Sequence, residues 1–256
     1  KVEGNDRWDR RAAMFRLDPR RELDRNLAGM VELLQPDDTV LDVGGGAGRV
    51  SLPIALRCQE VVNVEPSPAM RQQFEESAAE AGITNARAVD GAWPRDAAGL
   101  QADVVLVNNV TYFVREIVPF VEALERAARR LVVISVWSVP PPNHPSRLYE
   151  LVYGEALAPA PSHRELLPVL WDRGLLPDVR VLPEPFRGLG REVQPTREAA
   201  IAYALNALDA EGDDDIAGKL QSRFGELFEP VERGFRPPWA AATRAFELSW
   251  PPPAAG

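Results

Sequence analysis

The stretch that decides the fold is LDVGGGAGRV at residues 41–50, in which four of the five residues from 44 to 48 are glycine. An apolar run, TVLDV at 39–43, precedes the glycines and reads as a buried strand, and an apolar pattern of helical spacing begins directly after them. A flexible linker would have neither flank. We therefore interpret the glycines as a tight turn that leads from a strand into a helix.

Strand-like and helix-like segments alternate along the chain around this turn. Such alternation predicts a parallel sheet with helices on both faces, because parallel strands are connected by crossover helices. The apolar periodicity predicts strands at 39–43, 60–64, 86–89, 103–107 and 131–137, and helices at 68–81 and 117–129.

The pattern changes beyond residue 137. A rigid proline-rich loop at 139–145 is followed by segments that continue the sheet, and an extra helical segment interrupts them. We expect a helix at 163–173, a strand at 178–182, a helix opened by Thr196, a second helix at 215–228 and a last strand at 240–250.

Size and composition fit a globular protein. The chain has 256 residues, of which 45% are hydrophobic, enough for one large α/β domain or two small ones. No run approaches the roughly 20 apolar residues that span a bilayer, and the first residues lack the apolar core of a signal peptide. We expect a cytoplasmic protein with no membrane partner. Its scarce lysine and abundant arginine, alanine and proline are typical of a GC-rich bacterial genome.

The ionisable residues exclude several kinds of partner. The formal charge of -9 would repel a phosphate backbone, so we expect no nucleic-acid partner. A single cysteine, Cys58, rules out a disulfide framework and a cysteine zinc cluster. With only two histidines in the chain, we expect no metal site.

The glycine turn is suited to a ligand. In an open parallel sheet, ligands bind beyond the carboxyl ends of the strands. Glycines there permit positive φ and let a ligand approach the backbone. The dinucleotide fingerprint is G-x-G-x-x-G, whereas this chain has Asp42, Gly44, Gly46 and Gly48 at alternate positions. A carboxylate before the turn suits a cationic ligand better than a pyrophosphate.

These residues resemble the nucleotide motif of the class I S-adenosylmethionine-dependent methyltransferases, and the resemblance covers roughly residues 40–137. It implies that the acid at the end of the second strand, Glu65, holds both ribose hydroxyls, since two carboxylate oxygens can face a vicinal diol. Ser67 and Pro68 predict a capped helix start. The resemblance places Met70, in the same run VVNVEPSPAM, against the adenine.

Two further loops complete the resemblance. AVDGAWP matches the acidic loop after the third strand and implies that Asp90 lies near the adenine amino group, with Ala92 or Trp93 against the ring. VNNVTYFV matches the loop on the methionine side. The implied cofactor-binding residues are Asp42, Gly44, Gly45, Gly46, Glu65, Pro66, Met70, Asp90, Gly91, Ala92, Trp93, Asn108 and Asn109.

The resemblance implies a Rossmann-like α/β fold with a seven-stranded, mostly parallel sheet whose last strand is antiparallel. We expect one methyltransferase domain over 1–256, with an N-terminal helical cap at 1–35 and a helical lid at 188–231. The cofactor would be S-adenosylmethionine and the acceptor a small molecule. Residues 108–111 read NNVT and lack the Asn-Pro-Pro-aromatic run of enzymes that methylate amino groups of nucleic acids. The oligomeric state is left open.

The expected reaction needs little covalent help, because positioning donor and acceptor can supply about 7–11 kcal/mol. Covering segments must still exclude water. We expect the N-terminal helix with Trp8 and Phe15, the loop at 140–149 and the insertion with Tyr203, Phe224 and Phe228 to line one pocket. That pocket would face Asn109 and Tyr112. His144 is the first candidate for orienting the acceptor or removing its proton, and Tyr112 is the second.

Two other functions share this fold. An NAD(P)-dependent oxidoreductase would keep the acid after the second strand, but its glycine spacing and catalytic residues are not evident. A catalytically silent, methyltransferase-like binding protein would be free to lose cofactor contacts. The retained Asp42, Gly44, Gly46 and Glu65 argue against that loss.

Overall fold

The computed structural model describes residues 12–96, 99–185, 193–239 and 243–253. The chain falls into two compact units. The first, here the sheet unit, comprises Lys1–Val136, His163–Glu184 and Ala245–Gly256. The second, here the helical unit, comprises Trp137–Ser162 and Pro185–Arg244. The single domain over 1–256, the cap at 1–35 and the lid at 188–231 stay predictions.

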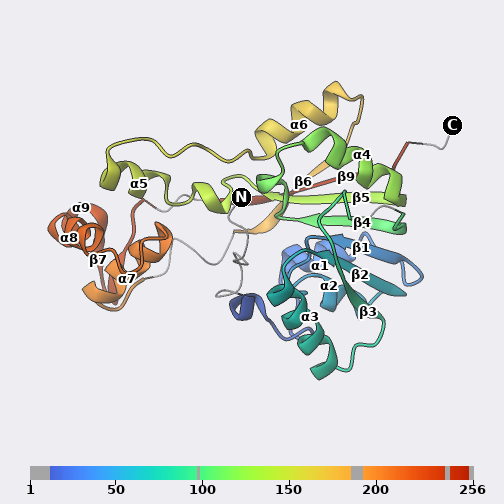
Figure 1. The fold of residues 1–256 in the computed structure, drawn as a ribbon, viewed down its shortest axis with the longest axis horizontal. Coiled ribbons are helices and arrows are strands. Elements are labelled where there is room, and N and C mark those ends of the chain that lie inside the picture. Colours follow the sequence, from blue (N-terminus) through green and yellow to red (C-terminus); the bar gives the residue numbers. More distant parts are fainter. Residues whose placement is uncertain (1–11, 97–98, 186–192, 240–242, 254–256) are drawn as a thin grey trace. The chain divides into compact units, whose positions relative to one another are not determined.

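The sheet unit is built on one sheet, which has seven strands within the described residues, in the order β3-β2-β1-β4-β5-β9-β6 (Figure 1). The neighbours from β3 through β5 pair in parallel, and the last strands are antiparallel, which confirms the predicted Rossmann-like sheet. The strands are β1 (Thr39–Val43), β2 (Glu60–Glu65), β3 (Ala86–Asp90), β4 (Ala102–Asn108), β5 (Ala128–Trp137), β6 (Asp178–Pro185) and β9 (Arg244–Trp250).

Helices follow β1, β2 and β4, whereas the described residues between β3 and β4 form no helix. Ser67 caps α3 by accepting from the Met70 amide at 3.2 Å, and Pro68 occupies the first helical turn, as predicted. Figure 1 shows α3 beside β2 and β3. The helices of this unit are η1 (Ala12–Phe15), α1 (Arg25–Val31), α2 (Ser51–Ala55), α3 (Pro68–Glu80), η2 (Thr111–Phe113), α4 (Ile117–Ala127) and α6 (His163–Asp172). No helix in the described ranges is long and apolar enough to cross a bilayer.

One apolar cluster joins α1, α2 and α3 to the sheet. Phe74 of α3 is fully buried among side chains such as Leu52 and Ile54 of α2 and Met30 of α1. Strand residues that include Val40 and Val61 complete the cluster. Close packing of this kind holds β1 and β2, the strands that lead to the glycine turn and to Glu65, against the helices.

The boundary between α4 and β5 differs from the prediction. The helix ends at Ala127 and the strand begins at Ala128, within the segment expected to be helical to residue 129. Arg130 donates from Nε to the buried Asp38 carboxylate at 3.1 Å and also bonds to the Leu33 carbonyl. These long-range bonds hold the start of the strand and leave no local signal in the sequence.

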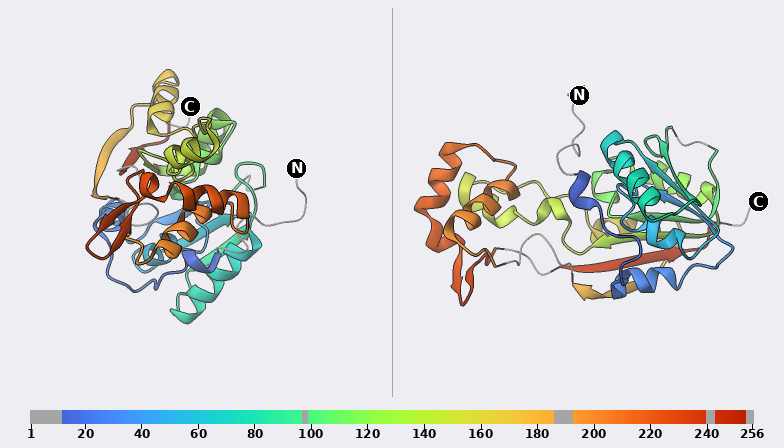
Figure 2. Two further views of the ribbon diagram at one scale, coloured as in Figure 1. Left: turned by 90° about the vertical axis from the view of Figure 1, so that its left-hand side faces the viewer. Right: turned by 90° about the horizontal axis from the view of Figure 1, so that it is seen from below.

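The helical unit has its own apolar core. Figure 2 shows the helices of residues 197–227 in orange. Thr196 caps α7, as predicted, whereas the helix expected at 215–228 is broken at Arg223 into α8 and α9. The loop expected over 140–149 is largely helical, and a hairpin, β7 with β8, had no sequence prediction. The elements are η3 (Pro141–Asn143), α5 (Ser146–Tyr153), α7 (Arg197–Ala207), α8 (Asp214–Ser222), α9 (Phe224–Leu227), β7 (Glu229–Val231) and β8 (Gly234–Arg236).

Candidate functional site

The turn after β1 needs glycine for both conformation and space. Gly44, Gly46 and Gly48 have φ values of 73°, 56° and 81°, which favour glycine. A Cβ on Gly48 would lie 2.6 Å from the Phe74 ring, and one on Gly44 would lie 2.6 Å from a Val110 methyl group. The turn is therefore closely packed against α3 and against the loop that follows β4.

Asn63, a residue that sequence reasoning missed, holds this turn from β2. Its Oδ1 accepts from the Gly45 amide at 3.0 Å, and its Nδ2 donates to the Gly46 carbonyl at 2.9 Å. The side chain is completely buried. The one signal in the sequence is a polar residue inside the apolar run EVVNVE.

Asp42 lies at the end of β1, completely buried, and neither carboxylate oxygen has a hydrogen-bond partner. Burial raises the pKa of Asp42 to about 7; the Ser51 hydroxyl lowers this pKa and the Glu65 charge raises it. A Cβ on Gly45 would stand 2.3 Å from Asp42 Oδ2. The Asp42 carboxyl group therefore lies directly against Gly45 of the glycine turn.

Glu65 joins the glycine turn to the start of α3. Its Oε2 accepts from the Gly46 amide at 3.0 Å, and its Oε1 accepts from the Ser67 amide at 2.9 Å. Only 6% of the residue is exposed. Each carboxylate oxygen can accept two hydrogen bonds, so these contacts are compatible with the diol-holding role that the sequence predicts.

Met70 covers the other side of the turn. Its Sδ lies 3.6 Å from the position of a Cβ on Gly46, and the side chain is buried. It packs with Ala47 and with Ala12 and Phe15 of the N-terminal segment. Pro66, the neighbour of Glu65, is exposed. The structure thus brings together the predicted residues after β1 and β2.

The N-terminal segment is fastened along α3. Arg16 pairs with Glu76 at 3.5 Å and with Glu80, and Arg20 donates to the Ala81 carbonyl at 2.7 Å. Arg21 donates to the Arg49 carbonyl in the glycine turn at 2.9 Å. Of the predicted covering aromatics, Phe15 lies in this segment, and Trp8 lies outside the described residues.

The predicted residues in the loop after β3 differ in their exposure and in their contacts. The Asp90 side chain is 74% exposed and pairs with Arg71 at 2.8 Å, while Gly91 is buried. Ala92 donates its amide to Asp96 at 3.1 Å. Trp93 is partly buried and directs its indole Nε1 to the Phe120 carbonyl of α4 at 3.5 Å. Arg71 also donates to the Glu65 carbonyl at 2.7 Å and so links β2 to β3.

The loop after β4 forms a short polar network. Asn109 has a φ of 62°, a strained value for a residue with a side chain, and its amide donates to the Ser135 carbonyl of β5 at 2.9 Å. Its Nδ2 donates to Asn108 Oδ1 at 2.5 Å. The Tyr112 hydroxyl donates to Asn109 Oδ1 at 3.0 Å, and Tyr112 is only 5% exposed. These bonds hold the loop after β4 in this conformation.

His144 belongs to the helical unit. Its Nε2 lies 3.0 Å from the Val139 carbonyl oxygen, which can only accept, so Nε2 carries a proton and donates. The predicted covering aromatics Phe224 and Phe228 pack in the core of this unit, and Tyr203 stacks on Trp239. That His144 and these segments face Asn109 and Tyr112 stays a prediction.

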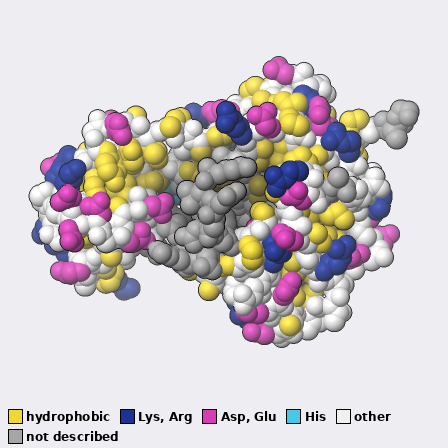
Figure 3. All heavy atoms as spheres, viewed as in Figure 1, with side chains coloured by type: hydrophobic (Ala, Val, Ile, Leu, Met, Phe, Trp, Pro, Cys, Tyr) yellow, Lys and Arg dark blue, Asp and Glu magenta, His cyan; other side chains and the backbone are white. Residues whose placement is uncertain are grey.

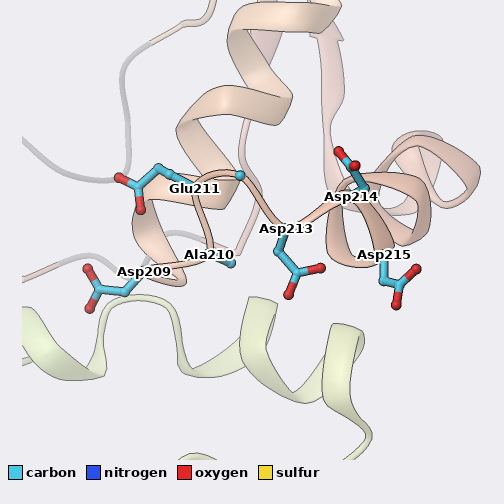
Figure 4. A pocket seen from close by; sticks show the side chains of 7 residues that line it. Asp209, Ala210, Glu211, Asp213, Asp214 and Asp215 are labelled. Atoms are coloured by element: carbon cyan, nitrogen blue, oxygen red, sulfur yellow. The ribbon is translucent and has the colours of Figure 1, made fainter.

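A third group of polar side chains lies in the turn between α7 and α8, where an open hollow of about 610 Å³ is lined by residues 209–215. Its carboxylates point in different directions (Figure 4). Asp213 caps α8, and Glu211 accepts from Asn206 at 2.5 Å. Across the described residues, no group of three His, Cys, Asp or Glu is arranged to hold a metal ion.

Comparison with known sequences finds a family match over part of the chain. Residues 40–132 match the family described as "Methyltransferase domain". The 23S rRNA (uracil(1939)-C(5))-methyltransferase RlmD of Aeromonas hydrophila is 36% identical over 104 residues, 39% of this chain and 23% of that enzyme. The same enzyme from Klebsiella pneumoniae strain 342 is 46% identical over 52 residues, 12% of its length. The chain thus spans less than a quarter of the curated relatives that it matches.

Solved structures share the fold over most of the chain. The YcgJ protein of Bacillus subtilis superposes with a TM-score of 0.57 at 14% identity, covering 88% of this chain and 97% of that one. Magnesium protoporphyrin IX methyltransferase of Synechocystis, with bound SAH, gives 0.52 at 15% identity, covering 87% and 80%. The sequence match thus covers residues 40–132, and the solved structures share the Rossmann-like fold with this chain.

Proposed function

We propose that the protein transfers the methyl group of S-adenosylmethionine to a small-molecule acceptor. The observation that carries this proposal is the cradle at the carboxyl ends of β1 and β2. There a glycine turn with three positive φ values lies between a buried acid, Asp42, and a second acid, Glu65. A Cβ at Gly45 would collide with Asp42, so this turn accepts no larger side chain there.

The residues of the cradle have distinct proposed roles. S-adenosylmethionine supplies a methyl group already activated on a positively charged sulfur. Glu65 would hold the ribose hydroxyls, and Met70, buried beside Gly46, would form an apolar wall. Gly44, Gly45 and Gly46 would let the cofactor approach the backbone. Asn108 and Asn109 would bind its amino-acid end.

The loop after β3 would close the adenine end of the site. Gly91, Ala92 and Trp93 follow β3 next to Asp90, which is the residue proposed near the adenine amino group. The Asp90 carboxylate is exposed and already pairs with Arg71, so binding adenine would add to an existing contact. The Trp93 indole is directed to α4.

The acceptor side rests on two residues. The Tyr112 hydroxyl is oriented by Asn109, whose backbone is in turn fixed to β5. The His144 ring is oriented by Nε2, which donates to the Val139 carbonyl. We propose His144 first and Tyr112 second for orienting the acceptor or removing its proton. Covalent catalysis by the single cysteine is disfavoured, because burial raises the pKa of the Cys58 thiol to about 11.

Charge supports a small acceptor. The sequence of the helical unit contains nine basic and twelve acidic residues, and its turn at residues 209–215 is acidic (Figure 4). On the face drawn in Figure 3, basic and acidic side chains of the described residues are intermixed and form no continuous basic stripe. A polyanion gains most of its affinity from such a stripe.

RNA is the second candidate acceptor, and the similarity to the rRNA enzymes favours it. The two acceptors can be separated with S-adenosylmethionine labelled in its methyl group. We expect label in a small-molecule extract depleted of polymers and none in purified rRNA fragments. Label in the rRNA alone would contradict the proposal of a small acceptor.

A heat-denatured sample is the background control for the labelling assay.

Calorimetry with S-adenosylmethionine, NAD and NADP is done before the labelling assay, and we expect binding of S-adenosylmethionine only. Binding of a dinucleotide without binding of S-adenosylmethionine would instead support the oxidoreductase alternative.

A further inference from the structure

Asp42 is a buried acid that the proposed chemistry does not use. It has no exposed surface, so it touches no ligand directly, yet it stands immediately beneath the glycine turn. Both of its oxygens lack hydrogen-bond partners. A buried carboxylate in that position is costly to ionise unless a positive charge comes near it.

The surroundings of Asp42 supply no such charge. On β2, the side-chain amide of Asn63 is hydrogen-bonded to the glycine turn. The negative charge of Glu65 raises the pKa of Asp42 further. On α2, Ser51 contributes a neutral hydroxyl, and the neighbour on β4 is Leu106. No lysine or arginine among the described residues forms an ion pair with Asp42.

We infer that Asp42 senses the charge of the cofactor: it holds a proton in the empty site and releases it to solvent when S-adenosylmethionine binds. The inference rests on the proposed function, because it requires that cofactor to bind in this cradle. S-adenosylmethionine carries one positive charge more than S-adenosylhomocysteine, the product left after methyl transfer. Once the sulfur is neutral, Asp42 takes a proton back from solvent, and the product loses the attraction that favoured the cofactor.

The sign of the pH dependence follows from linkage. The cation favours the ionised carboxyl group, so affinity for S-adenosylmethionine rises with pH through neutrality. With a pKa of about 7 in the empty protein, about half a proton leaves at pH 7. The same linkage makes binding up to about tenfold tighter at pH 8 than at pH 6. The product shows a smaller dependence.

Isothermal titration calorimetry in buffers of different ionisation enthalpy counts this proton. The cofactor's own amino group also titrates near neutrality, but its contribution is common to the wild type and to D42N, which cannot ionise at this position. We expect the wild type to release about half a proton more than D42N at pH 7 with S-adenosylmethionine, and clearly less with S-adenosylhomocysteine. Equal counts for wild type and D42N, or for the two ligands, would overturn the inference.

A second measurement covers the case in which D42N fails to fold or bind. The ¹³C chemical shift of the Asp42 carboxyl carbon, followed against pH in the wild type, reports its protonation directly. We expect a midpoint near neutrality in the empty protein and a midpoint well below it with S-adenosylmethionine. An unchanged midpoint in protein that binds the cofactor refutes the inference, whereas absence of any binding heat refutes the proposed function instead.

Discussion

Replacing Asp42 by asparagine should change how stability depends on pH. The carboxyl group has a pKa of about 7 in the folded chain and an ordinary value of 3.8, so the folded state binds its proton more tightly than the unfolded state does. The destabilising contribution is therefore absent at low pH, grows as pH rises above 3.8 and levels off above the folded pKa. Asparagine does not ionise, so it makes no pH-dependent contribution to the free energy of unfolding.

The magnitude follows from the same two values. Between pH 5 and pH 8, integrating the difference in bound protons gives about 2.5 kcal/mol lost by the wild type relative to D42N. Static effects of the amide, such as its own unmade hydrogen bonds, shift the D42N curve as a whole and cancel from this change. We therefore expect the free energies of unfolding of wild type and D42N, plotted against pH, to diverge as pH rises.

Urea unfolding followed by circular dichroism at pH 5, 6, 7 and 8, without cofactor, measures the free energy of unfolding of both proteins. Asp103 on β4 is the matched control, because bonds from Thr39 hold its pKa below the ordinary value. D103N should therefore run parallel to the wild type over this whole range. If the D42N and wild-type curves were also parallel, Asp42 would be ionised throughout, and the account of its burial would be refuted.

Three further predictions concern other parts of the molecule. Glu65→Ala should weaken S-adenosylmethionine binding by about 1–3 kcal/mol in calorimetry, while Glu60→Gln, at the far end of β2, should leave it unchanged. Arg180→Met should lower the free energy of unfolding by about 1–3 kcal/mol, since it strands the buried Glu247 carboxylate 2.8 Å away; an unaltered urea midpoint would contradict this. Thr196→Ala should cost about 1 kcal/mol through the lost cap of α7, and equal melting curves for variant and wild type would show that the cap contributes nothing.

The parts of the fold written in local sequence were predictable. The run TVLDV forms β1 over the predicted residues, Ser67 and Pro68 open α3, and Thr196 caps α7. Each of these signals lies within a few residues of the structure that it specifies. The glycine spacing with its preceding acid belongs to the same class, because the conformation that it needs is local.

Features made by long-range contacts were not predictable in this way. Asn63 holds the glycine turn from the neighbouring strand. Arg130, which follows the end of α4, bonds to Asp38 and so holds the start of β5. Neither bond could be inferred without the register of the sheet. The roles of Trp93 and Asp90 depend likewise on α4 and on Arg71, which lie outside their own loop.

The position of β9 governs the order in which the sheet can assemble during synthesis. This strand lies between β5 and β6, yet it follows β6 by roughly 60 residues along the chain. At about 5–20 residues per second, the ribosome needs on the order of 3–12 s to make that stretch. Until then β6, with Val179 and Val181 exposed even in the finished fold, has no place in the sheet. Nascent chains should therefore be most prone to aggregate in this interval, and a chaperone that shields an apolar strand edge would act there.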